Sequence, residues 1–167
     1  MKKIVRASML LIVVHLSGHA RAESSFLAES TRDTGLTWQL SPLTYHFSQN
    51  EAHKRVVMVG LEREHPNAQL DGVALFTNSF GQPTVYAYPW GGVYRNLGGI
   101  YRLSFKWTAG LLYGYKAPYA DKVPLNFKGF SPAVIPAIAY EFKSGWTGQL
   151  NFLGTAGLMF QLNVPVV

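Results

Sequence analysis

The sequence predicts an all-β fold, an eight-stranded antiparallel transmembrane β-barrel that follows a short N-terminal periplasmic segment. Three observations predict it: the first residues have the composition of a secretory signal, later segments alternate between apolar and small or polar residues, and few residues are charged. Only 14% are charged and another 14% are aromatic, whereas soluble domains contain about 25% charged residues. We therefore expect the barrel wall to face lipid.

Residues 1–22 form the predicted signal peptide. Met1-Lys2-Lys3 is basic, residues 9–14 are apolar, and Ala20-Arg21-Ala22 provides the small residues of a cleavage site. The apolar stretch is too short to span a bilayer, so we expect cleavage after Ala22 rather than a membrane anchor. The mature protein would be one domain, 23–167, whose first residues, 23–35, form at most a short periplasmic helix.

Removal of the signal changes the charge of the chain. It contains four of the fifteen basic residues and none of the nine acidic ones, so the formal charge falls from +6 to +2. The high isoelectric point is then no evidence for nucleic-acid binding, which we exclude. The chain has no cysteine, which also excludes a disulfide-stabilised secreted domain.

Period-two alternation predicts the strands. In residues 104–115 one face includes Phe105, Trp107 and Tyr115, and the opposite face includes Lys106 and Thr108. Strands of soluble sandwiches alternate as well, but the recurrence of the pattern with so little charge favours a closed barrel in lipid. The expected strands are 36–47, 55–64, 70–79, 84–90, 103–115, 133–142, 146–154 and 156–164.

An even number of strands places both termini at the periplasmic side, so the connections after the first, third, fifth and seventh strands face the exterior. On the sixth strand, Ala133, Ala137 and Ala139 share the inward face. Small side chains there leave room in a lumen that eight strands otherwise just fill.

No complete catalytic motif is present, neither Gly-x-Ser-x-Gly nor His-Glu-x-x-His nor a glycine-rich phosphate loop. His46 and Ser79 fall at the expected outer ends of the first and third strands, where structural roles are open as well. We expect no metal site, because His46, His53 and His65 are divided between the two ends of the barrel, and no cofactor.

Four collinear segments carry a resemblance. They are Gly72-Val73-Ala74-Leu75-Phe76-Thr77-Asn78-Ser79-Phe80 with Tyr88-Pro89-Trp90, then Pro42-Leu43-Thr44-Tyr45-His46, Phe105-Lys106-Trp107-Thr108-Ala109-Gly110-Leu111 and Pro132-Ala133-Val134-Ile135-Pro136. Together these segments resemble the outer-membrane lipid A palmitoyltransferases, the PagP family. The resemblance implies a bacterial outer-membrane enzyme that moves a palmitoyl chain from a membrane phospholipid to lipid A, and we expect it to be a monomer.

The resemblance also implies site residues. His46 corresponds to the catalytic histidine of the family, and we expect it to act as general base. Ser79 is the expected oxyanion donor or nucleophile, with Asn78 as an orienting group or second donor. Asn78 replaces an aspartate of the family, and an amide cannot stabilise an imidazolium by charge. Pro89 lies near a glycine that sets chain length in the family, so acyl selectivity is not carried over.

Lipid substrates must reach such a site through the wall, and proline opens a strand ladder because it has no N–H. Pro42, Pro132 and Pro136 are therefore candidate lateral gates, although they could simply mark strand starts. Lys54 and Arg55 are candidate contacts for lipid A phosphates. The outer loops also carry Lys116, Lys122 and Lys128, and simple solvation of all these charges is the alternative.

Two other functions fit the same sequence. A non-enzymatic barrel with a structural or adhesive role would share the architecture and tolerate loss of His46, since a fold does not fix a function. A lipid A deacylase on the same scaffold would hydrolyse an ester rather than exchange it.

Overall fold

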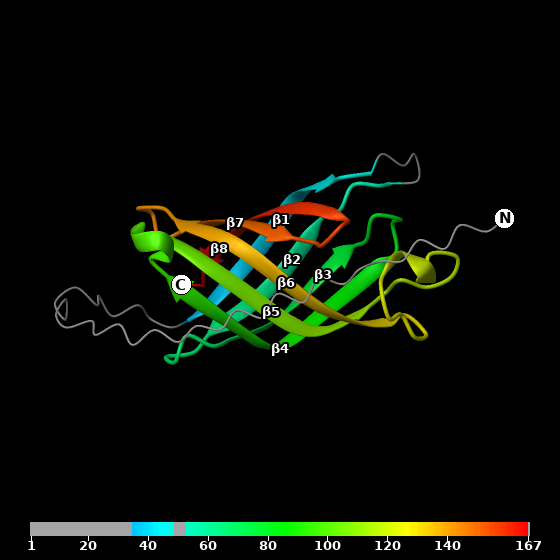
Figure 1. Cartoon of the computed structure of the whole chain (residues 1–167), viewed down its shortest axis with the longest axis horizontal. Helices are drawn as coiled ribbons and strands as arrows, with labels where there is room; N and C mark the ends of the chain where they lie inside the picture. Colours follow the sequence, from blue (N-terminus) through cyan, green and yellow to red (C-terminus); the bar gives the residue numbers. More distant parts are fainter. Residues whose placement is uncertain (1–34, 49–52, 167) are drawn as a thin grey trace. The chain divides into compact units, whose positions relative to one another are not determined.

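The computed structural model describes residues 35–48 and 53–166. They form a closed barrel in which β1 to β8 are neighbours in sequence order, and every pair is antiparallel (Figure 1). The strands are β1 Leu36–His46, β2 Met58–Glu64, β3 Leu70–Thr77, β4 Pro83–Arg95, β5 Leu103–Tyr113, β6 Phe130–Glu141, β7 Thr147–Phe152 and β8 Gly157–Pro165. The predicted all-β, eight-stranded barrel is confirmed.

Two short 3-10 turns, η1 (Leu97–Gly99) and η2 (Ala120–Lys122), lie in the connections after β4 and β5. In the part of the chain that the structure describes, no helix is long and apolar enough to cross a membrane. The predicted signal peptide, 1–22, and the segment up to residue 34 lie outside the described residues.

β4 shows the largest difference from the predicted strands, because it continues through Gly91 and Gly92 to Arg95. Glycine weakens a strand in isolation, but here it allows close packing. A Cβ added at Gly91 would lie 2.9 Å from Leu70 Cβ, and one at Gly92 would lie 2.9 Å from Trp107 Nε1. β2 begins at Met58 rather than Arg55, and β6 begins at Phe130 rather than Ala133.

Side chains alternate between lumen and exterior as predicted. Lys106 is buried on β5, while Phe152 and Phe160, at exterior positions of β7 and β8, are 38% and 45% exposed. Many other large apolar side chains are exposed around the barrel, which fits a wall that faces lipid. Tyr115 is an exception to the prediction, because it lines the lumen. β5 ends at Tyr113, so its alternation does not extend to Tyr115.

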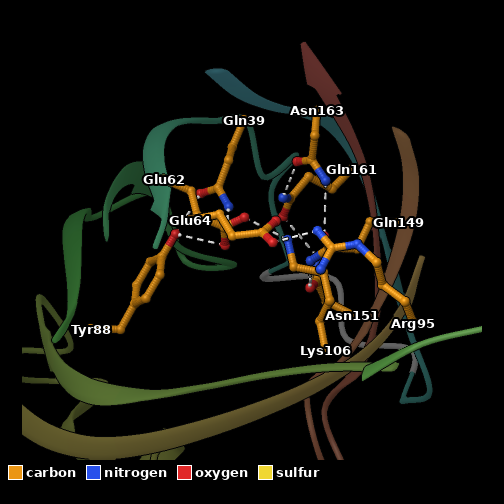
Figure 2. Close-up of polar contacts among 10 residues, drawn as sticks. All are labelled: Gln39, Glu62, Glu64, Tyr88, Arg95, Lys106, Gln149, Asn151, Gln161 and Asn163. Carbon is orange, nitrogen blue, oxygen red and sulfur yellow. Dashed lines mark hydrogen bonds and ion pairs between the residues drawn. The ribbon is translucent and has the colours of Figure 1, made fainter. Parts of the chain in front are cut away.

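Polar side chains fill the end of the lumen near the two ends of the barrel chain (Figure 2). Lys106 Nζ donates to Glu62 Oε1 at 2.5 Å, and the two side chains are 10% and 6% exposed. Gln39 Nε2 donates to the other Glu62 oxygen at 3.1 Å, and the Tyr88 hydroxyl donates to Gln39 Oε1 at 3.0 Å. The buried carboxylate therefore has both a cation and a hydrogen-bond donor, which a buried charge requires.

Four amides on β7 and β8 complete this polar layer. Gln149 Nε2 donates to Asn151 Oδ1 at 2.6 Å, and Asn151 Nδ2 donates to Gln161 Oε1 at 2.8 Å. Gln161 Nε2 donates to Asn163 Oδ1 at 2.5 Å, and Asn163 Nδ2 donates back to Gln149 Oε1 at 2.9 Å. Within the ring each amide donates once and accepts once, so the ring is closed, and Asn151 Nδ2 also donates to the Met159 carbonyl at 3.5 Å. We call these four amides with Gln39, Glu62, Tyr88 and Lys106 the polar floor.

Replacement of Lys106 by Met should destabilise the barrel by about 3–5 kcal/mol, because it leaves the Glu62 carboxylate buried without a cation. Urea unfolding of the refolded barrel, followed by tryptophan fluorescence and by gel migration, measures this loss. The double variant Glu62→Gln/Lys106→Met should recover most of it, since no charge remains. A single variant as stable as the parent would show that the ion pair does not stabilise the floor.

Candidate functional site

A cavity of about 310 Å³ occupies the half of the lumen away from the chain ends. Its lower boundary is the polar floor, and His46, Ser79 and Tyr115 lie at its mouth. Its walls are mainly apolar and include Met58, Ala74, Phe76, Leu112, Ile135 and Met159. Such a cavity suits a ligand with a hydrocarbon part and a polar reacting part.

The structure brings His46 and Ser79 to the same end of the barrel, as the strand order predicts. His46 is the last residue of β1, and Ser79 follows β3, which ends at Thr77. Both residues line the cavity. We call this end the site rim, and the end with the first residue of β1 and the last of β8 the termini rim. The catalytic roles of the two residues stay predictions.

His46 lies against a second histidine. The rings of His46 and His53 have centroids 4.3 Å apart, and the backbone carbonyl of Ala156 interacts with the His46 ring. His46 Nε2 is buried and has no hydrogen-bond partner among the described residues. A neutral ring with a free nitrogen lone pair is what a general base needs. His53 was not predicted as part of the site, because its connection follows no strand period.

His65 is in the β2–β3 turn at the termini rim. No three side chains of metal-ligating type lie together in the described ranges.

Asn78 is fully buried and holds the β3–β4 turn. Its Oδ1 accepts hydrogen bonds from the backbone N–H groups of Phe80 and Gln82, both at 3.0 Å, and its Nδ2 donates to Gln82 Oε1 at 3.4 Å. This arrangement is an Asx turn. Within the described residues Asn78 makes no hydrogen bond to His46 or Ser79, so it positions Ser79 through the backbone rather than orienting His46.

Gln82 connects this turn to the β5–β6 connection. Its Oε1 accepts from the Lys116 backbone N–H at 3.0 Å, and its Nε2 donates to the Lys116 carbonyl at 3.2 Å. The turn that holds Ser79 is therefore fixed on two sides, which limits how far the Ser79 hydroxyl can move.

Ser79 contacts Lys54 and Tyr115, and neither contact was predicted from the sequence. Its carbonyl accepts from the Lys54 backbone N–H at 2.7 Å, and the Tyr115 phenol interacts with its side chain. Burial raises the pKa of Tyr115 above its ordinary value, so the phenol stays protonated near neutral pH and can donate. The sequence pattern did not indicate this role, because its alternation places Tyr115 on the exterior face of the fifth strand.

The barrel wall has a first break beside Pro42. β1 pairs with β2 only from Leu36 to Ser41, and in the described chain it has no strand partner on that side from Pro42 onward. The register with β8 also shifts between Leu40 and Leu43. The Ser41 hydroxyl donates to the Phe160 carbonyl of β8 at 2.6 Å, at a point where proline provides no N–H.

A second break lies between β6 and β7. Their pairing begins at Ala137, opposite Asn151, so residues 130–136 pair with β5 but not with β7. Pro132 and Pro136 are both in this stretch and lack the N–H that a ladder toward β7 would use. Pro132 does not mark a strand start, because β6 begins at Phe130, which pairs with Tyr113.

Both breaks contain a Ser-Pro pair with a buried serine. Ser41 and Ser131 are each 2% exposed, and the Ser131 hydroxyl donates to the Pro124 carbonyl at 2.5 Å. The serine hydroxyls thus satisfy one backbone carbonyl of β8 and one of the β5–β6 connection.

The basic residues of the site rim differ in their surroundings. Arg55 Nε donates to the Pro42 carbonyl at 3.3 Å and so crosses the first break. The Lys54 side chain lies over the β3–β4 turn, since a Cβ added at Gly81 would be 2.8 Å from Lys54 Cδ. The other three contact residues of the β5–β6 connection or the end of β5: Lys116 lies over Tyr113, Lys122 pairs with Asp121, and Lys128 lies over Phe127.

Comparison of the chain with models of protein families found no match, and a search among curated proteins found none either.

Substitutions at Asn78 test whether its side chain stabilises the β3–β4 turn. Asn78→Leu should cost about 1–3 kcal/mol for each of the two N–H groups that lose their acceptor, whereas Asn78→Asp retains an acceptor oxygen for both groups and should lose less than Asn78→Leu. Urea midpoints measure both variants. Asn67→Leu is the matched control, because Asn67 accepts from Gln69 N–H in an exposed turn. A small loss in Asn78→Leu would contradict the Asx-turn role.

Proposed function

We propose that the protein is an outer-membrane acyltransferase that moves a palmitoyl chain from a phospholipid to lipid A without a cofactor. One observation carries the proposal: three features lie in the same half of the barrel. They are the apolar cavity that ends at the polar floor, the mouth of this cavity with His46 and Ser79, and the two breaks in the wall. A purely structural or adhesive barrel needs none of these features. The resemblance of the sequence to the lipid A palmitoyltransferases agrees with them.

The cavity supports binding of the acyl chain, since a hydrocarbon chain inside it would leave the ester near the mouth. In the proposed reaction His46 takes the proton from the attacking hydroxyl of lipid A as that oxygen bonds to the ester carbonyl carbon. Ser79 donates a hydrogen bond to the oxyanion, with Tyr115 as its partner. The bond to the phospholipid oxygen then breaks, and that oxygen takes the proton from His46, which restores the base.

The two breaks support lateral access, because a lipid cannot cross a wall whose ladder is complete. Two separate breaks allow the donor phospholipid and lipid A to approach from different sides. Lys54 and Arg55 lie at the first break, between β1 and β2. Ammonium and guanidinium groups bind phosphate well, so we propose that lipid A approaches from this side.

The proposal is tested by the lipid A of a Gram-negative strain that lacks its own palmitoyltransferase and expresses the chain. Mass spectrometry should find lipid A heavier by one palmitoyl group. His46→Ala and Ser79→Ala should each lower this product at least about a hundredfold, which is the lower range for loss of a general base or an oxyanion donor. Ser144→Ala, in the exposed β6–β7 turn, is the matched control and should leave the product unchanged.

The same spectra distinguish the other functions. Lipid A that loses an acyl chain would indicate a deacylase. Unmodified lipid A, with barrel of normal abundance and gel migration, would favour a structural or adhesive role and would refute the transferase.

If lipids enter through the second break, its two prolines should be needed for acyl transfer but not for the stability of the barrel. In Pro132→Ala/Pro136→Ala the new N–H groups allow β6 to extend its pairing toward β7. We expect transfer to fall at least about tenfold, equivalent to ~1.4 kcal/mol in the barrier, while the urea midpoint stays equal or rises. Pro66→Ala, in the β2–β3 turn, is the control. Unchanged transfer by the double variant would show that lipids do not use this break.

A further inference from the structure

A second hollow lies in the wall near the termini rim, between β3 and β4. Regular pairing of these strands stops at Gly72 and Tyr88, and the next contact is an isolated bridge between Gln69 and Gly92. Between the two pairs β3 contributes two residues and β4 contributes three, so β4 bows away from β3. A pocket of about 350 Å³ fills the opening. We call it the β3–β4 pocket.

The pairing of β4 with β5 also contains a bulge at the position where β4 is displaced from β3. The register between β4 and β5 shifts between Ala87 and Trp90, and Pro89 in this bulge has no N–H to leave unpaired. Opposite the bulge is Gly110, where an added Cβ would lie 2.0 Å from the Ala87 carbonyl oxygen. Only glycine fits at this point, so the pocket is part of the barrel wall rather than of a loop.

Three aromatic residues surround the pocket. Trp90 and Tyr94 are 65% and 61% exposed, and the partly buried Trp107 is the ladder partner of Gly92. Gly92 leaves room for the Trp107 indole, because a Cβ there would lie 2.9 Å from its Nε1. Aromatic faces around one hollow attract ammonium groups.

Charged residues at the pocket complement a zwitterion. Asp71 lines it, with its side chain 30% exposed, and accepts hydrogen bonds from Arg63 at 3.0 and 3.3 Å. His65 also lines the pocket and hydrogen-bonds the same carboxylate. The Arg63 side chain is 56% exposed. A carboxylate beside aromatic rings suits an ammonium group, and an exposed guanidinium next to it suits a phosphate.

We propose that the β3–β4 pocket binds the headgroup of a zwitterionic phospholipid that carries an ammonium group, phosphatidylethanolamine. The ammonium lies against Asp71 and the aromatic rings, and the phosphate lies against Arg63. The proposal rests on the membrane location in the proposed function, in which the termini rim faces the inner leaflet, but not on acyl transfer. Interfacial aromatics are common in membrane barrels, but they do not require a hollow with a carboxylate inside it.

Native mass spectrometry of the mature chain in mild detergent tests the proposal, with phosphatidylethanolamine and phosphatidylglycerol of the same acyl chains as probes. We expect the barrel to bind phosphatidylethanolamine at least about tenfold more tightly, a difference within the range of a desolvated cation-π contact. Asp71→Asn and Trp90→Ala should each reduce this preference to less than about twofold. Trp146→Ala, an exposed tryptophan of the same rim outside the pocket, should retain it.

Three results would overturn the proposal. They are equal affinity for the two lipids, a preference that survives both Asp71→Asn and Trp90→Ala, and a preference that appears only after removal of residues 23–34, which would make that segment the occupant. His46→Ala should keep the preference even though we expect it to lower acyl transfer at least about a hundredfold. Failure of the β3–β4 pocket and failure of the proposed function are therefore distinguishable, and gel migration confirms that each variant is folded.

Discussion

Backbone hydrogen bonding around a closed sheet is the constraint on which this structure depends. β8 pairs with β1, so the sheet is closed, and each departure from pairing must have a local reason. The departures all involve proline: Pro42 at the first break, Pro132 and Pro136 at the second, and Pro89 at the bulge beside the β3–β4 pocket. Proline removes a donor without leaving an unsatisfied N–H. An opening made in this way lies within an otherwise rigid wall and needs no mobile loop.

The lumen is divided because polar and apolar side chains occupy different halves of the same strands. The polar floor uses charge and amide groups, and its internal bonds satisfy them at a depth where hydration is lost. Above it, β2, β3 and β6 contribute smaller or apolar residues, and the space that remains is the cavity. A fully apolar lumen would close by packing, and a fully polar one would hold water. The division therefore creates a cavity that the polar floor bounds at one end.

Most of the fold could be predicted from the sequence, and much of the site could not. Alternation identified the eight strands and the lumen-facing residues, because one side of every strand is buried and the period of two is exact. It did not identify the continuation of β4 through Gly91 and Gly92, since that depends on contacts with Leu70 and Trp107 from other strands. Tyr115 and His53 lie in connections, where no period applies. The sequence motif around Asn78 likewise does not show that the Asn78 side chain accepts hydrogen bonds from the backbone of the β3–β4 turn.

Asn78 stands where the lipid A palmitoyltransferases that the sequence resembles have an aspartate, and the geometry around His46 shows what this difference means for the proposed reaction. Asn78 is occupied by the β3–β4 turn, and the ring next to His46 is another histidine, so the described residues offer no carboxylate to an imidazolium at His46. A protonated His46 would be unfavourable, because the neighbouring ring of His53 is also an imidazole and offers no negative charge. On the proposed function, His46 must therefore pass its proton to the leaving oxygen soon after taking it from the attacking hydroxyl. A single exchange of this kind charges His46 only once, whereas a covalent Ser79 intermediate would charge it in each of two steps. The residues around His46 thus favour Ser79 as the oxyanion donor, with Tyr115 holding its hydroxyl in place.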